Sequence, residues 1–285
     1  MAITSASDIP SLSLLYKLGK LSPAPAGTKP PTTISFSSTA LPAPSKSFND
    51  RIGLIRGDIT TLSVDAIVNA ANSSLLGGGG ADGAIHRAAG RGLVRECRSL
   101  GGCPTGSAKI TAAYSLPCRK VIHAVGPVYD MLQPEESERL LTGCYEKSLE
   151  LAVQYGCRTV AFSGLSTGVY GYPSREAAPV AITAVRKFLE GKDGASLDKV
   201  VFVTFEKKDV DAYNDFLPLY FPPVTESSKV ETQDAAAACS AQGAEAKAEA
   251  KAEAEAQEVA SELPDVPKTD PDATGPAEKK QKHTD

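Results

Sequence analysis

Short apolar runs alternate with helix-like segments between residues 51 and 223, and this alternation constrains the fold more than any other sequence feature. Several of the runs are continuously apolar, as is typical of strands buried on both faces. The apolar runs span 51–59, 65–71, 109–114, 120–126, 158–166 and 198–205, and the helical patterns span 81–90, 135–156, 173–191 and 209–221. We therefore predict an α/β domain with helices on both faces of a sheet.

The segment that precedes this domain has a different character. Residues 1–50 contain one helical candidate, in which Leu12, Leu15 and Leu18 share a face and Asp8 can cap the start. The sequence that follows the candidate is rich in proline, serine and threonine. We interpret it as a linker or a loosely docked arm in front of the domain.

Residues 224–285 form an acidic tail in the predicted organisation. They hold 7 lysines and 14 acidic residues, a net charge of −7, which leaves +3 for residues 1–223 from the totals of 30 and 34. The tail is rich in Ala, Glu and Lys without an apolar stripe, so we expect it to be disordered. Lys279, Lys280 and Lys282 fit a nuclear-targeting cluster or a solubilising one, and we expect the protein in the cytoplasm, the nucleus or both.

Composition argues against several classes of protein. No apolar run approaches the roughly 20 residues that cross a bilayer, and the N-terminus lacks the regions of a secretory signal. The six cysteines form no CxxC pair and only three histidines are present, so we expect reduced thiols and no structural metal. The net charge of the body suits an anionic small ligand but is too small to indicate nucleic-acid binding.

Two glycine-bearing loops follow predicted strands. NSSLLGGGGAD comes after the strand that ends near Asn69, and SGLSTGVYGYP comes after the strand that ends near Phe162. In α/β sheets, ligands bind at the carboxyl ends of strands, where bare backbone amides can contact a phosphate. Four consecutive glycines alone would indicate a flexible surface loop, but a second loop of the same kind favours a phosphate site.

The known phosphate and nucleophile motifs fit poorly. The sequence has no GxxxxGK[ST] and no GxGxxG that opens a helix, which argues against a P-loop and a dinucleotide site. Residues 164–168 match the G-x-S-x-G nucleophile elbow, but the only histidine after Ser166 is His283, in the tail. We therefore interpret Ser166 and Thr167 as hydroxyl and amide donors to a phosphate.

Asp82 and His86 lie four residues apart at the start of a predicted helix, so they share a face. They could form an acid–base pair, or Asp82 could cap the helix beside a surface partner, and the pair alone favours the second interpretation. We predict that His123, within the apolar KVIHAVG, is a hydrogen-bonded core histidine. Asn69 and Asn72 could be turn residues.

Taken together, these segments resemble the MacroD-type macrodomains. The similarity runs from about residue 51 to residue 223, and LSLLYKLGKL near the N-terminus is similar to the leading helix of that subfamily. The matching segments, in chain order, are GDIT (57–60), NAANSSLLGGGGADGAIHRAAG (69–90), TGSAKIT (105–111), VIHAVGP (121–127) and LSTGVYGYP (165–173).

The resemblance implies a three-layer α/β/α domain with a mixed, mostly parallel sheet of about six strands. MacroD-type members bind ADP-ribose, remove mono-ADP-ribose from acidic side chains and deacetylate O-acetyl-ADP-ribose. The resemblance thus implies a hydrolase that splits an ester on the distal ribose with an oriented water, and neither a metal nor a cofactor is expected. The implied partners are ADP-ribose, ADP-ribosylated proteins and O-acetyl-ADP-ribose; we expect no membrane or nucleic-acid binding, and a monomer.

The resemblance also assigns roles to the residues that match the family's motifs. Asp82 would position or activate the water, His86 would lie behind Asp82 and hold it, and Asn72 would bind the distal-ribose hydroxyls. The adenine would contact Asp58, Ile59 and Phe205. The distal ribose and the diphosphate would contact Gly77, Gly78, Gly79, Gly80 and Ala81 from the first loop and Ser166, Thr167, Gly168, Val169 and Tyr170 from the second. Any Cβ within Gly77–Gly80 would obstruct the ligand, and Ala81 stands where relatives often carry a larger aliphatic residue.

Other functions fit the same motifs. The chain could be an ADP-ribose reader without turnover, a phosphatase for ADP-ribose 1″-phosphate, or a scaffold in which the tail acts. The joint presence of Asn72, Asp82 and His86 favours the hydrolase, because binding alone needs no acid–base arrangement.

Overall fold

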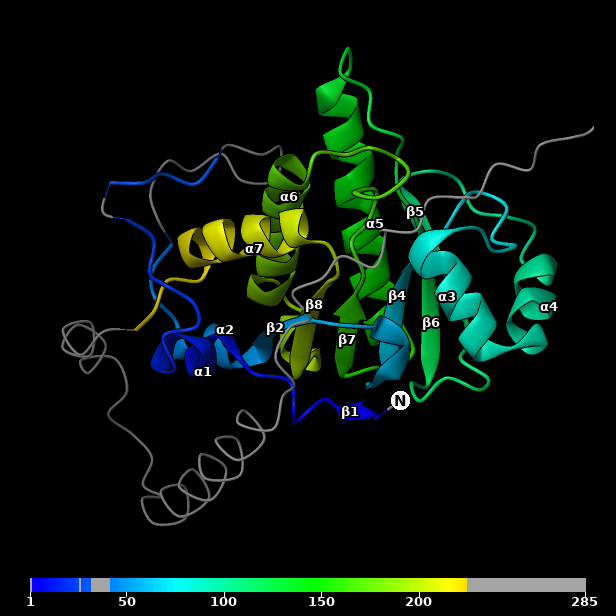
Figure 1. The fold of residues 1–285 in the computed structure, drawn as a ribbon, viewed down its shortest axis with the longest axis horizontal. Helices are drawn as coiled ribbons and strands as arrows, with labels where there is room; N and C mark the ends of the chain where they lie inside the picture. The colour runs from blue at the N-terminus through cyan, green and yellow to red at the C-terminus, as the bar shows by residue number, and fades with distance from the viewer. Residues whose placement is uncertain (1, 26, 32–41, 225–285) are drawn as a thin grey trace, which may run out of the picture. The chain divides into compact units, whose positions relative to one another are not determined.

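A six-stranded sheet forms the centre of the computed structural model, which describes residues 2–25, 27–31 and 42–224. The strand order is β2 (Ile52–Arg56), β8 (Lys199–Thr204), β7 (Thr159–Phe162), β4 (Ala66–Ala70), β6 (Lys120–Val125) and β5 (Ser107–Ala112). Neighbouring strands run parallel except β5, which is antiparallel to β6 (Figure 1). The predicted mixed, mostly parallel sheet is confirmed, whereas the prediction for the tail from residue 225 onward lies outside the described residues.

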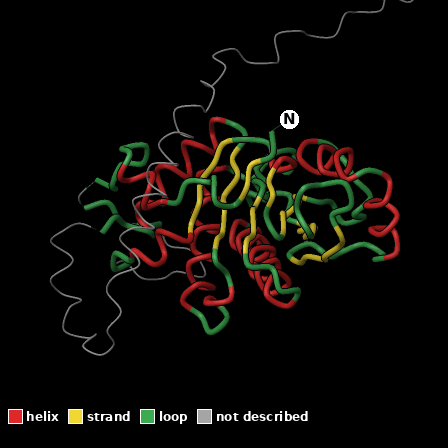
Figure 2. Tube along the Cα trace, turned by 90° about the horizontal axis from the view of Figure 1, so that it is seen from below, coloured by secondary structure: helices red, strands yellow, loops and turns green. Residues whose placement is uncertain are grey.

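Helices cover both faces of this sheet, and Figure 2 shows the strands side by side between them. One face is covered by α5 (Pro134–Gln154), α6 (Ser174–Glu190) and α7 (Lys207–Tyr220), and the other by α3 (Gly80–Ala89) and α4 (Arg91–Ser99). Ala66 and Val68 of β4 belong to the core cluster on the first face, whereas Ile67 belongs to the cluster on the second. Successive strand residues point to opposite faces, so continuously apolar strands fill two cores at once.

The N-terminal helix differs from the prediction. Helix α1 (Leu12–Lys17) is capped by Ser11, whose side chain accepts a hydrogen bond from Leu14 N. Asp8 accepts from Ser5 instead, so the predicted Asp8 cap is wrong. Leu12 and Leu15 are buried as expected, but the helix ends before Leu18, which is 37% exposed.

The segment before α1 is fixed against the main domain. Strand β1 (Thr4–Ser5) pairs with β3 (Leu62–Ser63), and Lys199 Nζ donates to the carbonyls of Ala6 and Ile9 at 2.8 and 2.6 Å. β3 directly follows the short 3-10 helix Ile59–Thr61, so this N-terminal segment supports the loop after β2.

Two helices have no counterpart in the sequence prediction. Helix α2 (Lys46–Arg51) begins within the segment interpreted as a linker and is capped by Ser45. Helix α4 follows α3 directly, with Gly90 between them, and buries Leu93 and Cys97 at helical spacing. Among the described residues, none of the helices has the length and apolarity needed to span a bilayer.

Candidate active site

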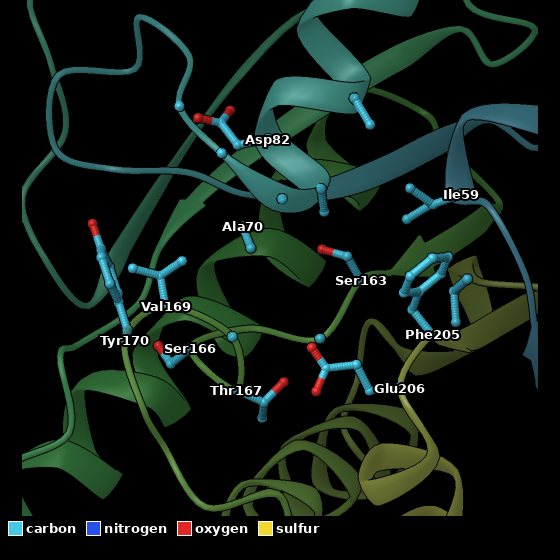
Figure 3. A pocket seen from close by; sticks show the side chains of 18 of the residues that line it. Ile59, Ala70, Asp82, Ser163, Ser166, Thr167, Val169, Tyr170, Phe205 and Glu206 are labelled. Atoms are coloured by element: carbon cyan, nitrogen blue, oxygen red, sulfur yellow. The ribbon is translucent and has the colours of Figure 1, made fainter. Parts of the chain in front are cut away.

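A pocket of about 790 Å³ opens at the carboxyl ends of the parallel strands (Figure 3). Gly57 follows β2, Ala71 follows β4, Gly126 follows β6 and Ser163 follows β7, and all four residues line the pocket. This is the edge of an open α/β sheet at which loops and helix N-termini converge on a ligand. The strand order places both glycine-bearing loops there.

Most of the residues assigned by the resemblance line this one pocket. They are Asp58, Ile59, Asn72, Gly78, Gly79, Gly80, Ala81, Asp82, Ser166, Thr167, Gly168, Val169, Tyr170 and Phe205. Gly77 and His86 do not line it; they lie behind the wall, where a Cβ on Gly77 would sit 3.4 Å from His86 Cγ. The roles of these residues toward a ligand stay predictions.

The sequence interpretation missed several charged residues of the pocket. Arg87 lies on α3, and Glu206, Lys208 and Asp209 follow the end of β8. For the last three, the position just after a buried parallel strand was the signal that could have found them. Lys208 Nζ donates to Thr167 O at 2.8 Å, so one of them also holds the second loop.

The glycine run forms the entry to α3. Gly77 and Gly80 have φ values of 91° and 57°, in the left-handed region that side chains with a Cβ disfavour. Gly79 is the N-cap, so Asp82 lies in the first turn of the helix rather than at its cap. A carboxylate is favourable there, because the first turn of a helix carries the positive end of the helix dipole.

Asp82 is buried, and only one of its two carboxylate oxygens accepts a hydrogen bond from the described residues. Its Oδ1 accepts a hydrogen bond from Asn69 Nδ2 at 2.7 Å and lies 3.4 Å from His86 Nε2. Its Oδ2 is buried and accepts no hydrogen bond from the described residues. Burial raises the pKa of Asp82, while the Asn69 hydrogen bond and the charge of His86 act in the opposite direction. The carboxylate is therefore a poorly solvated base in the pocket wall.

The two asparagines have different roles. Asn69 lies in β4 and is fully buried, so its interpretation as a turn residue is wrong. Asn72 does organise a turn: its Oδ1 accepts from Ser74 N and Oγ at 3.1 and 2.6 Å, and its Nδ2 donates to Gly77 O at 2.9 Å. Asn72 thus shapes the glycine loop while it faces the pocket.

The second loop presents a constrained serine to the pocket. Ser166 has a φ of 63°, and its buried Oγ has no hydrogen-bond partner among the described residues. The loop is held from outside, since Tyr129 N donates to Tyr170 O at 2.9 Å. Val169 is 91% exposed at the rim. A buried hydroxyl without a partner, in a strained backbone and beside bare amides, suits an anionic ligand.

The opposite end of the pocket contains two large apolar side chains, Ile59 and Phe205. Ile59 is buried, whereas Phe205 is 72% exposed, so one face of its ring is open to the pocket (Figure 3). Asp58 Oδ1 accepts hydrogen bonds from Thr60 N and Oγ1 at 2.9 and 2.8 Å. An aromatic face beside an oriented carboxylate suits a nucleobase with an exocyclic amine.

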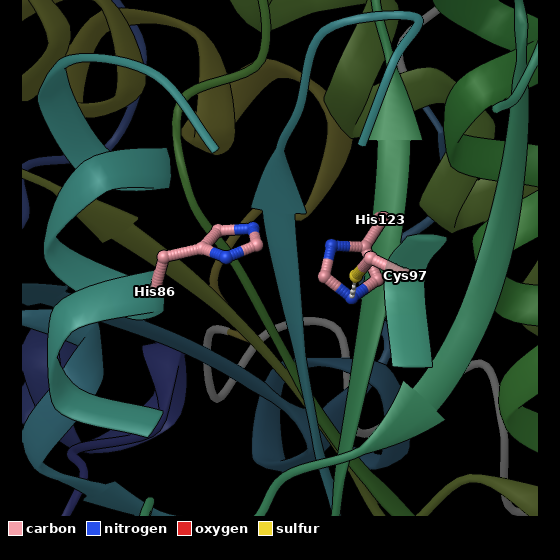
Figure 4. Close-up of side chains that lie close together, drawn as sticks. All are labelled: His86, Cys97 and His123. Carbon is pink, nitrogen blue, oxygen red and sulfur yellow. Dashed lines mark hydrogen bonds between the residues drawn. The ribbon is translucent and has the colours of Figure 1, made fainter. Parts of the chain in front are cut away.

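His123, His86 and Cys97 come close together, and none of the three lines the pocket (Figure 4). The nitrogen and sulfur atoms of the three side chains lie within 4.8 Å of one another. The expectation of no metal rested on the lack of a CxxC pair and on there being only three histidines, and the fold nevertheless brings two of the histidines close to Cys97. His123 Nε2 already lies 3.0 Å from Thr111 Oγ1 and 3.5 Å from Cys97 Sγ, so we interpret a hydrogen-bonded cluster, as predicted for a core histidine.

Known proteins are similar to this chain in sequence and in fold. A family model described as Macro domain matches residues 68–181. The Macro domain-containing protein CT2219 of Chlorobaculum tepidum is 56% identical over 169 residues, which cover 59% of this chain and 96% of that protein. The ADP-ribose glycohydrolase MACROD1 of Mus musculus is 53% identical over 62% of this chain, which spans only 54% of that protein.

A solved structure agrees with these sequence relatives. The Trypanosoma brucei macrodomain in complex with ADP-ribose aligns with a TM-score of 0.57 at 41% identity, over 71% of this chain and 82% of that one. The family model covers both glycine-bearing loops of the pocket, and the Chlorobaculum protein is matched over nearly its whole length. The chain therefore belongs to the macro domain family.

Proposed function

We propose that this protein hydrolyses ADP-ribosyl esters. It removes mono-ADP-ribose from modified Glu and Asp side chains and deacetylates O-acetyl-ADP-ribose. The observation that carries the proposal is Asp82, a buried carboxylate in the pocket wall with one oxygen held by Asn69 and the other without a donor among the described residues. A module that only binds ADP-ribose has no need for such a base.

Binding of ADP-ribose is the first part of the proposal. The T. brucei macrodomain was crystallised with ADP-ribose, and the pocket described above has the features that this ligand needs. Phe205 offers a ring face to the adenine, and the two loops offer backbone amides to the diphosphate. The distal ribose then lies between Tyr170 and the glycine run, beside Asp82.

Hydrolysis is the second part, and relatives named ADP-ribose glycohydrolase support it. Water adds across the ester bond of the distal ribose, and the products are ADP-ribose and the free carboxylic acid. Asp82 Oδ2 accepts a hydrogen bond from the water and orients it toward the ester. Because burial disfavours the charged form of Asp82, its carboxylate is a stronger base than an exposed aspartate.

The experiment mixes the purified protein with a target that is mono-ADP-ribosylated on Glu or Asp and follows ADP-ribose release. Asp82→Asn and Asp82→Ala are compared with the wild type, and ADP-ribose binding is measured for all three by calorimetry. We expect release by the wild type and a loss of about 10²- to 10⁴-fold in both variants, which still bind ADP-ribose. Binding without release in the wild type would make the protein a reader.

A phosphatase for ADP-ribose 1″-phosphate is the second candidate, because the same anion-binding loops could hold a terminal phosphate. The same assay with ADP-ribose 1″-phosphate separates the two activities. Release of inorganic phosphate at a higher kcat/KM than release of ADP-ribose from the modified protein would favour the phosphatase.

A further inference from the structure

A buried chain of polar side chains runs from Asp82 into the core behind the pocket. Asn69 Nδ2 lies 2.7 Å from Asp82 Oδ1 and 3.2 Å from His123 Nδ1. On the other side of the ring, His123 Nε2 lies 3.0 Å from Thr111 Oγ1 and 3.5 Å from Cys97 Sγ. All five side chains are buried, so these contacts are not shared with solvent.

The two contacts of Asn69 Nδ2 show which tautomer His123 holds. An amide nitrogen carries two N–H donors and accepts no hydrogen bond, so both Asp82 Oδ1 and His123 Nδ1 must act as acceptors. The ring proton of His123 is then on Nε2, which donates to Thr111 Oγ1. Burial lowers the pKa of His123 to about 3, with the charge of His86 as a smaller cause, so the ring is neutral at physiological pH.

The orientation of the Asn69 amide matters for Asp82. If the amide were reversed, its oxygen would face Asp82 Oδ1 at the distance where Nδ2 now donates. Two acceptor oxygens at that distance repel each other unless Asp82 carries a proton. The group that determines the orientation of the amide therefore determines how easily Asp82 loses its proton.

We propose that His123 is a positioning residue for the hydrolysis: its Nδ1 acceptor orients the Asn69 amide so that an N–H faces Asp82. This inference rests on the proposed function and deepens it. His123 does not line the pocket, and it acts on Asp82 only through Asn69.

The other titratable groups around Asp82 come from two elements. His86 lies one turn along α3, the helix that carries Asp82. Burial raises the pKa of Cys97 on α4 to about 11, with the charges of Glu96 and Asp82 as smaller causes. His86 does not replace Asn69, because its Nε2 is farther from Asp82 Oδ1, at 3.4 Å, and makes no hydrogen bond with the described residues. The remaining charged groups in the pocket lining are Asp58, Arg87, Glu206, Lys208 and Asp209.

The first experiment reads the tautomer directly in the full chain. Long-range ¹H–¹⁵N NMR of the histidine rings distinguishes Nε2–H from Nδ1–H, and His123→Asn assigns the resonances. We expect His123 in the Nε2–H form throughout the neutral range. An Nδ1–H form, or stoichiometric zinc bound through His86, Cys97 and His123, would overturn the proposal. This readout needs no turnover, so it holds even if the hydrolase assay fails.

The second experiment compares pH profiles of hydrolysis for His123→Leu and His123→Asn. Leucine removes the acceptor, whereas asparagine keeps an oxygen near the position of Nδ1. For His123→Leu we expect the midpoint of the acidic limb in the kcat–pH profile to rise by about one pH unit. On that limb kcat should fall roughly tenfold, while KM stays unchanged. His123→Asn should restore the limb to near its wild-type position. A folded His123→Leu with a wild-type limb would refute the proposal.

A second route avoids any change at His123 itself. The double variant Thr111→Val with Cys97→Ala removes both side chains that lie within hydrogen-bond distance of Nε2, so an Nε2–H would be left without an acceptor among the described residues. We expect the same upward shift of the acidic limb and an Nδ1–H signal in the NMR spectrum. If His123→Leu does not fold, an unshifted limb and an unchanged tautomer in this double variant would overturn the proposal.

Discussion

Gly126 and Ser166 are in direct contact: a Cβ on Gly126 would collide with Ser166 Oγ. The end of β6 thus supports the strained serine that follows β7, although 40 residues separate the two in the sequence. The absence of a side chain at position 126 lets the second loop reach its position in the pocket.

We predict that Gly126→Ala displaces Ser166 and weakens ADP-ribose binding about tenfold, or about 1.4 kcal/mol, in calorimetry. The matched variant is Gly126→Ala with Ser166→Ala, because removal of Oγ leaves the new Cβ only an ordinary contact at 3.4 Å. It should unfold at a higher temperature than Gly126→Ala alone. Equal melting temperatures for both variants would show that the collision does not matter.

Gly79→Ala tests why the glycine run is bare. Gly79 has an ordinary φ of −93°, and a Cβ there would meet no atom of the described residues within 4 Å. We therefore expect only a small fall in the melting temperature, because alanine is a poorer N-cap than glycine, and at least a tenfold loss of ADP-ribose affinity, because only the ligand can meet the new methyl group. Gly80→Ala, at a φ of 57°, should also lose about 1–2 kcal/mol of stability. Normal affinity in Gly79→Ala would contradict the predicted close approach.

The burial of Asp82 predicts a pH-dependent cost in stability. Burial raises its pKa in the folded protein above the unfolded value, so ionised Asp82 destabilises the fold at neutral pH. The cost fades as the pH falls through the folded pKa and is absent below the unfolded one. We expect Asp82→Asn to increase the free energy of unfolding in urea at pH 7 and to lose that gain toward pH 4. A gain independent of pH would point to another cause.

A substitution at Phe205 tests ligand binding without a large effect on the stability of the fold. Its ring is largely exposed, so Phe205→Ala should leave the melting temperature nearly unchanged while it weakens ADP-ribose binding by about 1–3 kcal/mol. Phe202, three residues earlier in β8, is fully buried and serves as the contrast. Phe202→Ala should cost about 3–5 kcal/mol of stability. Unchanged affinity in Phe205→Ala would exclude stacking of the adenine on this ring.

Sequence periodicity predicted the strands and most of the helices because each depends on local spacing. The strand ending near Asn69 and the helix ending just before Gly90 were found in this way. The cap of α1 was assigned wrongly, because Asp8 and Ser11 are both good caps and only the path of the chain chooses between them. Helix α4 was missed because it is short and follows α3 without a loop.

By itself, the sequence determined the two glycine loops, the carboxylate at position 82 and, through its motifs, the family. Only the tertiary structure decided what Asp82 contacts. β4 pairs with β6 so that Asn69 and His123 are register partners, and α3 then places Asp82 against that pair. Strand order and register are set by long-range packing of two apolar faces, which no local spacing encodes. The buried hydrogen bonds that tune the carboxylate follow from that packing.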